Sequence, residues 1–144
     1  MQLVRLVYYS RPVKATTPEE VLQILKSAMV KNERLGITGA LAVSNNYFVQ
    51  VLEGSRGHVS KLIFEIAADK RHDDVTLVSF EEVEERLFSK WSMSLYSITY
   101  DDDAVLFNYS TLPKLFDPTV MRPQAVLKFL QTLSKIDYPG LVLP

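Results

Sequence analysis

Gln50 is a polar side chain within residues 47–54, a segment whose other members are mostly aromatic, aliphatic or small. A buried carboxamide destabilises a fold unless partners satisfy both its donor and its acceptor. Tyr8 lies in a second β-rich apolar segment, residues 3–9. Because side chains alternate along a strand, the Tyr8 phenol faces the Gln50 amide if the two strands are neighbours. A bound ligand could then supply the remaining hydrogen-bond partners.

A second group of residues recurs at helical spacing. Ile24, Ala28 and Asn32 are four residues apart, so they form one stripe that ends in another carboxamide. Ile66, in a later helical segment, is placed to oppose Ile24. Two isoleucine walls, two amides and a tyrosine predict a slot for a flat heteroaromatic ring with donor and acceptor edges.

The elements that position these residues follow from periodicity and from turn and capping residues. Thr17, which is followed by a proline and two glutamates, predicts a helix N-cap, and Gly36 predicts a helix stop. The Asn45-Asn46 dipeptide tolerates the positive φ angles of a tight hairpin. Strands are predicted at residues 3–9, 37–44, 47–53, 75–83 and 94–99, and helices at residues 17–32, 55–69 and 123–136.

The resulting order is β-α-β-β-α-β-β, followed by a helix. It predicts an α+β fold with a ferredoxin-like sheet that has one added strand. The hairpin is apolar on both faces, so both faces of the sheet must be covered. We expect the two early helices on one face and the C-terminal helix on the other. Residues 1–100 would form the binding domain, and residues 101–144 a helical extension packed on the sheet.

Composition excludes several classes of function. At 144 residues and 47% hydrophobic, the chain suits a single core. The formal net charge is -1 and the basic residues are scattered, so we expect no nucleic-acid partner. No run approaches the ~18 apolar residues of a membrane span and no signal pattern is present, so a cytoplasmic location away from the membrane is expected. With no cysteine and only two histidines, we expect no thiol chemistry and no metal site.

The combination of these residues resembles the BLUF domains, flavin-binding blue-light receptors, and in particular the short members without an output enzyme. The resemblance extends from about residue 3 to residue 99, and the tail also resembles the helical cap of short members. The positions that carry it are Tyr8, Asn32 ahead of residues 36–39, Gln50 within residues 48–54, Arg71-His72, and Trp91-Ser92-Met93.

The resemblance implies a photoreceptor that is not an enzyme and that binds FAD noncovalently, with FMN or riboflavin as alternatives. The lack of a G-x-G-x-x-G segment agrees with this implication. Asn32 would pair with the N3–H and C4 carbonyl of the flavin ring, and Arg71 would lie near its pyrimidine edge. The cofactor-binding residues implied are Ile24, Ala28, Lys31, Asn32, Phe48, Gln50, Ile66, Arg71 and His72.

The resemblance also implies a mechanism. Blue light would drive electron and proton transfer from Tyr8 to the flavin through Gln50, whose amide would end rotated or tautomerised. Trp91 or Met93 would then move and carry the signal. One rearranged hydrogen bond is worth only about 0.5–1.5 kcal/mol. The output is therefore expected to be a near-balanced association, with a second copy of the chain or with a downstream protein.

Two positions depart from the family pattern. Ala28 stands where some members have a hydroxyl beside the glutamine, and Lys31 stands where close relatives have a second asparagine. Lys31 would contact either the flavin or solvent, and solvent is favoured because lysine is seldom buried.

Two other functions remain open. A light-independent oligomeric regulatory or ligand-binding module would use Tyr8 and Gln50 as core residues. An acylphosphatase-type hydrolase would need an arginine in an anion-binding loop after the first strand, but Arg11-Pro12 has no glycine-rich nest around it. The hydrolase is therefore the weaker alternative.

Overall fold

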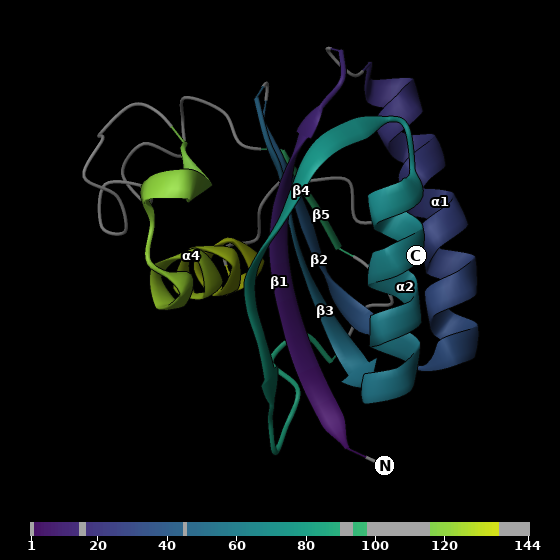
Figure 1. Cartoon of the computed structure of the whole chain (residues 1–144), viewed down its shortest axis with the longest axis vertical. Coiled ribbons are helices and arrows are strands. Elements are labelled where there is room, and N and C mark those ends of the chain that lie inside the picture. The colour runs from purple at the N-terminus through teal and green to yellow at the C-terminus, as the bar shows by residue number, and fades with distance from the viewer. Residues whose placement is uncertain (1, 15–16, 45, 90–93, 98–115, 136–144) are drawn as a thin grey trace.

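The computed structural model describes residues 2–14, 17–44, 46–89, 94–97 and 116–135. These residues form one five-stranded sheet with helices on both faces (Figure 1). The elements in chain order are β1 (Leu3–Pro12), α1 (Pro18–Leu35), β2 (Thr38–Val43), β3 (Phe48–Ser55), α2 (Arg56–Ala68), β4 (His72–Glu82), β5 (Ser94–Ser97), the 3-10 helix η2 (Pro118–Val120) and α4 (Pro123–Lys135).

The strand order of the sheet is β4-β1-β3-β2-β5. The first four strands are antiparallel to their neighbours, and β5 runs parallel to β2 at the edge. This order confirms the ferredoxin-like βαββαββ prediction, with β5 as the added strand. Because β1 lies directly beside β3, Tyr8 and Gln50 are partners in the ladder that joins the two strands.

Capping residues set the ends of α1. The side-chain hydroxyl of Thr17 accepts the backbone N–H of Glu20, as the sequence predicts for an N-cap. Gly36 ends the helix in the left-handed conformation, with a φ of 68°. The helix therefore continues past Asn32 to Leu35, so Asn32 lies in its last turn. Within the described residues, no helix has both the length and the apolar character needed to cross a bilayer.

The two faces of the sheet contribute to two separate hydrophobic clusters. Tyr8 and Phe48 belong to the cluster beneath α1 and α2. Val49 belongs to the opposite cluster, where it packs with Phe129 of α4. Figure 1 shows α1 and α2 on one side of the sheet and α4 on the other, which confirms the predicted layers. The division at residue 100 stays a prediction, because residues 98–115 and 136–144 lie outside the described residues.

β1 and β4 are both longer at one end than the sequence pattern indicates. β1 continues past Tyr9 to Pro12, and β4 begins at His72, because Pro12 and His72 are partners in the ladder. This ladder has register shifts immediately before Tyr8 and again after Tyr9. The ladder between β1 and β3 shows no such shift over the same residues. Such irregularities leave an extra residue unpaired and increase the local twist.

A buried ion pair lies on the α4 side of the sheet. Arg5 of β1 donates from Nε to Oε2 of Glu53 in β3 at 2.9 Å, and the exposed fractions of the two side chains are 8% and 0%. The Glu53 carboxylate also accepts the backbone N–H groups of Leu87 and Phe88. Glu53 therefore holds the segment that follows β4 against the sheet.

Candidate functional site

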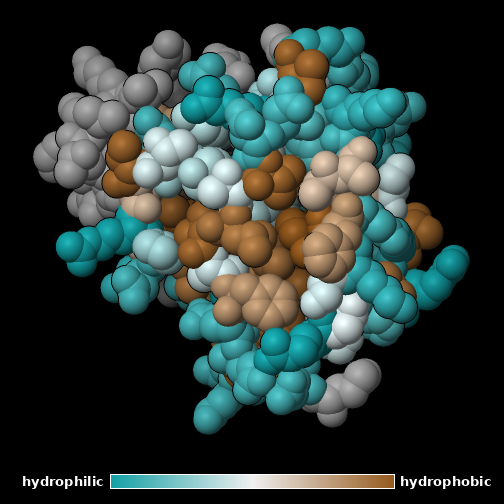
Figure 2. Space-filling view, viewed as in Figure 1, coloured by the Kyte–Doolittle hydropathy of each residue, from teal (hydrophilic) through white to brown (hydrophobic). Residues whose placement is uncertain are grey.

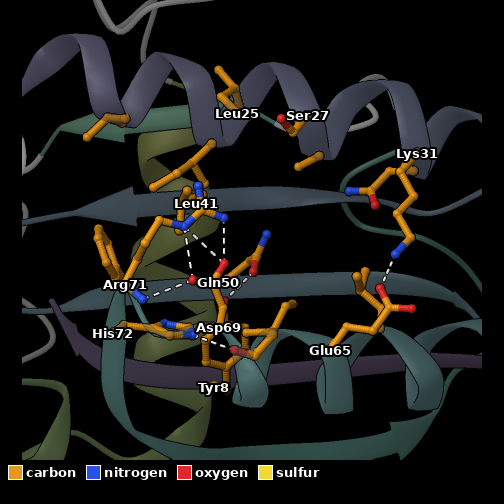
Figure 3. Close-up of a pocket in the computed structure, with 17 residues that line it drawn as sticks. Tyr8, Leu25, Ser27, Lys31, Leu41, Gln50, Glu65, Asp69, Arg71 and His72 are labelled. Atoms are coloured by element: carbon orange, nitrogen blue, oxygen red, sulfur yellow. Dashed lines mark hydrogen bonds and ion pairs between the residues drawn. The ribbon is translucent and has the colours of Figure 1, made fainter. Parts of the chain in front are cut away.

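A cavity of about 220 Å³ lies between α1, α2 and the sheet face that these helices cover (Figure 3). The sheet contributes Tyr8 and Gln50, and the helices contribute mostly apolar side chains. The predicted site residues that line this cavity are Tyr8, Ile24, Ala28, Lys31, Asn32, Phe48, Gln50, Ile66, Arg71 and His72. Trp91 and Met93 lie outside the described residues.

Tyr8 and Gln50 form a short hydrogen bond at the wall of this cavity. The Tyr8 hydroxyl donates to Oε1 of Gln50 at 2.5 Å, and the exposed fractions of the two residues are 3% and 6%. Burial raises the pKa of the Tyr8 phenol, and the nearby negative charge of Asp69 raises it further. Tyr8 is therefore a neutral phenol that donates a hydrogen bond to Gln50.

Asn32 places a second buried carboxamide at the cavity. Its backbone carbonyl accepts the N–H groups of Gly36 and Ile37, which fixes the last turn of α1. A carboxamide donates and accepts at once, so Asn32 and Gln50 fit a heteroaromatic edge that carries both an N–H and a carbonyl. Together with the apolar walls, this set of donors and acceptors fits the ring of a flavin. In the described part of the chain, no cluster of acidic and histidine side chains could hold a metal ion.

His72 forms an edge of the cavity and is held at both ring nitrogens. Nε2 lies 2.6 Å from the carbonyl oxygen of Ile66, and Nδ1 lies 2.8 Å from the hydroxyl of Ser10. Because a carbonyl can only accept, Nε2 carries a proton, and the Ser10 hydroxyl can donate to Nδ1 of the neutral ring. The ring contacts Tyr8 and Phe48 edge-on, at centroid distances of 6.5 Å and 6.2 Å. These contacts fix the orientation of the His72 ring at the edge of the cavity.

Two ion pairs lie at opposite ends of the cavity in Figure 3. Lys31 of α1 pairs with Glu65 of α2. Arg71 donates from Nε to both carboxylate oxygens of Asp69 at 3.0 Å. The hydrogen bond from the Arg71 side chain lowers the pKa of Asp69, and the same bond raises the pKa of Arg71. Lys31 is partly exposed, so it contacts solvent as well as its carboxylate partner.

Sequence reasoning missed several residues that line the cavity. Leu25 of α1 could have been included, because it is one turn from both Val21 and Ala28. Leu41 and Asp69 depend on how the sheet and the end of α2 pack, which local spacing does not reveal. The missed residues are Val21, Leu25, Ser27, Leu41, Leu62 and Asp69. Arg11, which the hydrolase alternative needs, is outside the cavity and lies over the ring of Tyr47.

Comparisons of sequence identify relatives of this chain. The family model for BLUF, the sensors of blue light using FAD, matches residues 3–94. The alpha subunit of a photoactivated adenylate cyclase from Euglena gracilis is 37% identical over 87 residues, which cover 60% of this chain and 8% of that protein. The beta subunit from the same organism is 34% identical over 93 residues, which cover 64% of this chain and 11% of that protein. The chain therefore matches only a small part of these curated relatives.

Solved structures resemble the chain over most of its length. The photo-activated state of BlsA superposes with a TM-score of 0.78 at 30% identity, covering 91% of this chain and 94% of BlsA. The dark state of BlrB, a BLUF protein, has a TM-score of 0.68 at 35% identity, covering 74% of this chain and 80% of BlrB. With the family match over more than half of its residues, the chain belongs to the BLUF family and is a blue-light sensor that uses FAD.

Proposed function

We propose that blue light moves an electron and a proton from Tyr8 to the flavin that the cavity would hold, with Gln50 relaying the proton. Both then return to Tyr8, and the amide of Gln50, left rearranged, changes how the protein associates. FAD, when bound noncovalently between α1 and α2, supplies the excited oxidant for this step. FMN and riboflavin carry the same ring and are alternatives; a related structure, BlrP1 of Klebsiella pneumoniae, contains FMN.

The hydrogen bond between Tyr8 and Gln50 is the observation that carries this proposal. The raised pKa keeps the phenol protonated, so an electron can leave Tyr8 at low cost only if its proton leaves too. The acceptor for that proton is already in place, because Oε1 of Gln50 is 2.5 Å from the hydroxyl. Rotation or tautomerisation of the amide then exchanges its donor and acceptor ends and changes the hydrogen bonds at the cavity wall.

Absorption spectra in darkness and under blue light test the relay. The flavin-loaded wild type should show a small red shift after illumination, and Tyr8→Phe and Gln50→Leu should each abolish it. Tyr9→Phe is the matched control, since Tyr9 is the next residue in β1 and packs on the opposite face of the sheet. A normal red-shifted state in Tyr8→Phe or in Gln50→Leu would contradict the relay.

The signal output that we propose passes through Trp91 or Met93. Both residues follow the segment that Glu53 holds through the N–H groups of Leu87 and Phe88. β3 carries both Gln50 and Glu53, so the strand that presents the amide also anchors the approach to Trp91. This connection supports a signal that leaves the cavity along β3 and the segment after β4.

The final step of the proposal is a change in self-association. A rearranged hydrogen bond shifts an equilibrium by at most about tenfold, so only a weak, balanced association can respond to it. Phe64 of α2 and Leu77 of β4 have exposed fractions of 75% and 54%. Figure 2 shows apolar surface gathered on the side of the molecule where α2 and β4 lie. Exposed apolar area of this kind is typical of interaction surfaces.

Light scattering coupled to size-exclusion chromatography, in darkness and under blue light, tests this step. The average mass should differ between the two conditions at concentrations near the midpoint of association. Phe64→Ser combined with Leu77→Thr should lower the mass in both conditions, whereas Val30→Thr, which changes an exposed residue of α1, should not. A mass that is the same in light and darkness at every concentration contradicts a light-dependent association of copies.

A further inference from the structure

The lysine, the arginine and the two carboxylates that line the cavity form two ion pairs. Lys31 pairs with Glu65, and Arg71 pairs with Asp69, so both cations face a carboxylate that lines the same cavity. Figure 3 shows one pair at each end of the cavity. The formal charges of the two pairs cancel. Among the described residues, neither end of the cavity therefore offers a cation that lacks a carboxylate partner.

Neither helix replaces the missing positive charge. α1 reaches the cavity from Val21 onward, and its first turn carries the acidic residues Glu19 and Glu20. A phosphate is usually bound by an unopposed arginine or lysine, by a helix N-terminus or by a glycine-rich nest. The part of α2 that lines the cavity extends from Leu62 to Ile66, in the C-terminal half of the helix. The helix dipole places partial negative charge at that end. The N-terminal residue of α2, Arg56, is not among the residues that line the cavity.

The polar atoms of His72 and Tyr8, which also line the cavity, already have partners within the protein. Both ring nitrogens of His72 are engaged by Ser10 and by the Ile66 carbonyl. Tyr8 is neutral and donates to Gln50. The polar groups that the cavity can direct at a ligand are therefore chiefly the carboxamides of Asn32 and Gln50, which suit a ring edge and not a phosphate.

We propose that Glu65 and Asp69 determine the flavin specificity of the cavity: they neutralise Lys31 and Arg71, so that the site selects the flavin ring and gives no preference to a phosphate-bearing tail. This inference rests on the proposed flavin binding and goes further, because it assigns a role to two carboxylates that no ring contact requires. It follows that the wild type binds riboflavin, FMN and FAD with dissociation constants within about threefold of one another.

The two pairs lie at opposite ends of the cavity, so the tail of a bound flavin passes only one of them, and removal of the carboxylate at that end releases a cation toward the tail. Glu65→Gln leaves Lys31 without its partner, and Asp69→Asn does the same for Arg71. Both cations are partly exposed, so a new contact with a phosphate has the strength of a surface ion pair or slightly more. The variant at the end where the tail lies should raise the ratio of the riboflavin to the FMN dissociation constant by about threefold to tenfold at low ionic strength, and the variant at the other end should leave this ratio unchanged.

The test is a titration of the flavin-free protein with riboflavin, FMN and FAD. Binding is measured as the quenching of flavin fluorescence, at low and at physiological ionic strength. Riboflavin and FMN differ only by the phosphate, so their ratio isolates that group whatever each variant does to ring binding. Glu33→Gln and Asp73→Asn are matched controls, because each removes one exposed carboxylate that does not line the cavity. Removal of the cation as well, in Lys31→Gln with Glu65→Gln or in Arg71→Gln with Asp69→Asn, should return a raised ratio to the wild-type value.

The outcomes separate this inference from the proposed function. If no flavin binds, both are wrong. If all three flavins bind but the ratio is the same in Glu65→Gln, in Asp69→Asn and in the controls, only the specificity inference is wrong. A wild type that binds FMN more than tenfold tighter than riboflavin would also overturn it, because the site would then already hold an effective cation for the phosphate.

Discussion

Arg5 and Glu53 form their buried ion pair on the same two strands that bring Tyr8 to Gln50, but on the opposite face of the sheet. β1 supplies the donor of both pairs, and β3 supplies the acceptor. One pair lies at the cavity, and the other holds the segment that follows β4. The register of a single ladder therefore sets the geometry of both.

Breaking the ion pair should be strongly destabilising. Glu53→Gln removes the buried carboxylate partner of Arg5 and leaves only the longer, exposed pair with Glu81 at 3.7 Å. Removal of one partner of a buried pair costs about 3–5 kcal/mol. Urea denaturation of the flavin-free protein measures this loss. Glu65→Gln removes a carboxylate from a partly exposed pair instead, and should change the free energy of unfolding by at most about 1 kcal/mol.

Arg5→Met in the Glu53→Gln background distinguishes the pair from general disruption of the sheet. If the loss comes from an unpaired charge, the double variant is more stable than the sum of the two single changes predicts. Strictly additive losses would show that the two side chains act independently.

Alkaline pH should destabilise the wild type more than Tyr8→Phe. The pKa of Tyr8 is raised in the folded protein, whereas a tyrosine in the unfolded chain titrates near pH 10. Above about pH 10 the unfolded chain therefore releases a proton that the folded protein keeps. The stability of the wild type should then fall with pH by up to about 1.4 kcal/mol per pH unit from this group.

Urea midpoints of the flavin-free proteins between pH 8 and about pH 11 measure this difference. Other groups titrate over the same range, but they are common to both proteins and cancel in the comparison. Parallel pH profiles for the wild type and Tyr8→Phe would mean that burial does not hold the phenol proton.

Two glycines around the start of β2 should differ sharply in their tolerance of alanine. A Cβ on Gly39 would lie 1.9 Å from the carbonyl oxygen of Val51, which is backbone and cannot turn aside. A Cβ on Gly36 meets no atom within 4 Å. Gly36→Ala should therefore lower the free energy of unfolding mainly through the left-handed φ, by about 1–2 kcal/mol. Thermal denaturation should show a much larger loss for Gly39→Ala. Equal losses would contradict the close approach of β2 to β3.

Removal of the Phe129 side chain, the largest that α4 buries, tests whether α4 covers the sheet. Phe129 is fully buried and stacks on Phe116 at a centroid distance of 5.3 Å. Phe129→Ala should lower the free energy of unfolding by about 3–5 kcal/mol, as for other large core aromatics. Lys128→Ala changes the exposed neighbour and should have little effect. If the two losses are similar, α4 is not part of the core.

Local signals in the sequence were sufficient for most of the fold. Thr17 and Gly36 mark the ends of α1 because capping depends on neighbouring backbone groups, and strand parity is enough to place Tyr8 beside Gln50. The extension of β1 to Pro12 could not be predicted from its own residues. It depends on pairing with His72, which is distant in the sequence and lies between the predicted helix at residues 55–69 and the predicted strand at residues 75–83.

The partners of the charged residues were also difficult to predict from the sequence, because they depend on which elements pack together. Arg5 and Glu53 lie in apolar strands on the same face, which could have indicated a buried pair once the strand order was known. The pair of Lys31 with Glu65 depends on the packing of α1 against α2, which no local spacing determines. Helix periodicity places Lys31 near the slot but does not identify the carboxylate that it meets.

The two register shifts around Tyr8 make the hydrogen-bond ladders on the two edges of β1 unequal in regularity. Toward β3 the ladder is continuous, so the phenol and the amide keep their alignment. Toward β4 the pairing is interrupted on both sides of Tyr8 and Tyr9, which leaves residues unpaired and increases the local twist. β1 is accordingly aligned more regularly with β3 than with β4, so the pairing of Tyr8 with Gln50 does not require a regular ladder on the outer edge of β1.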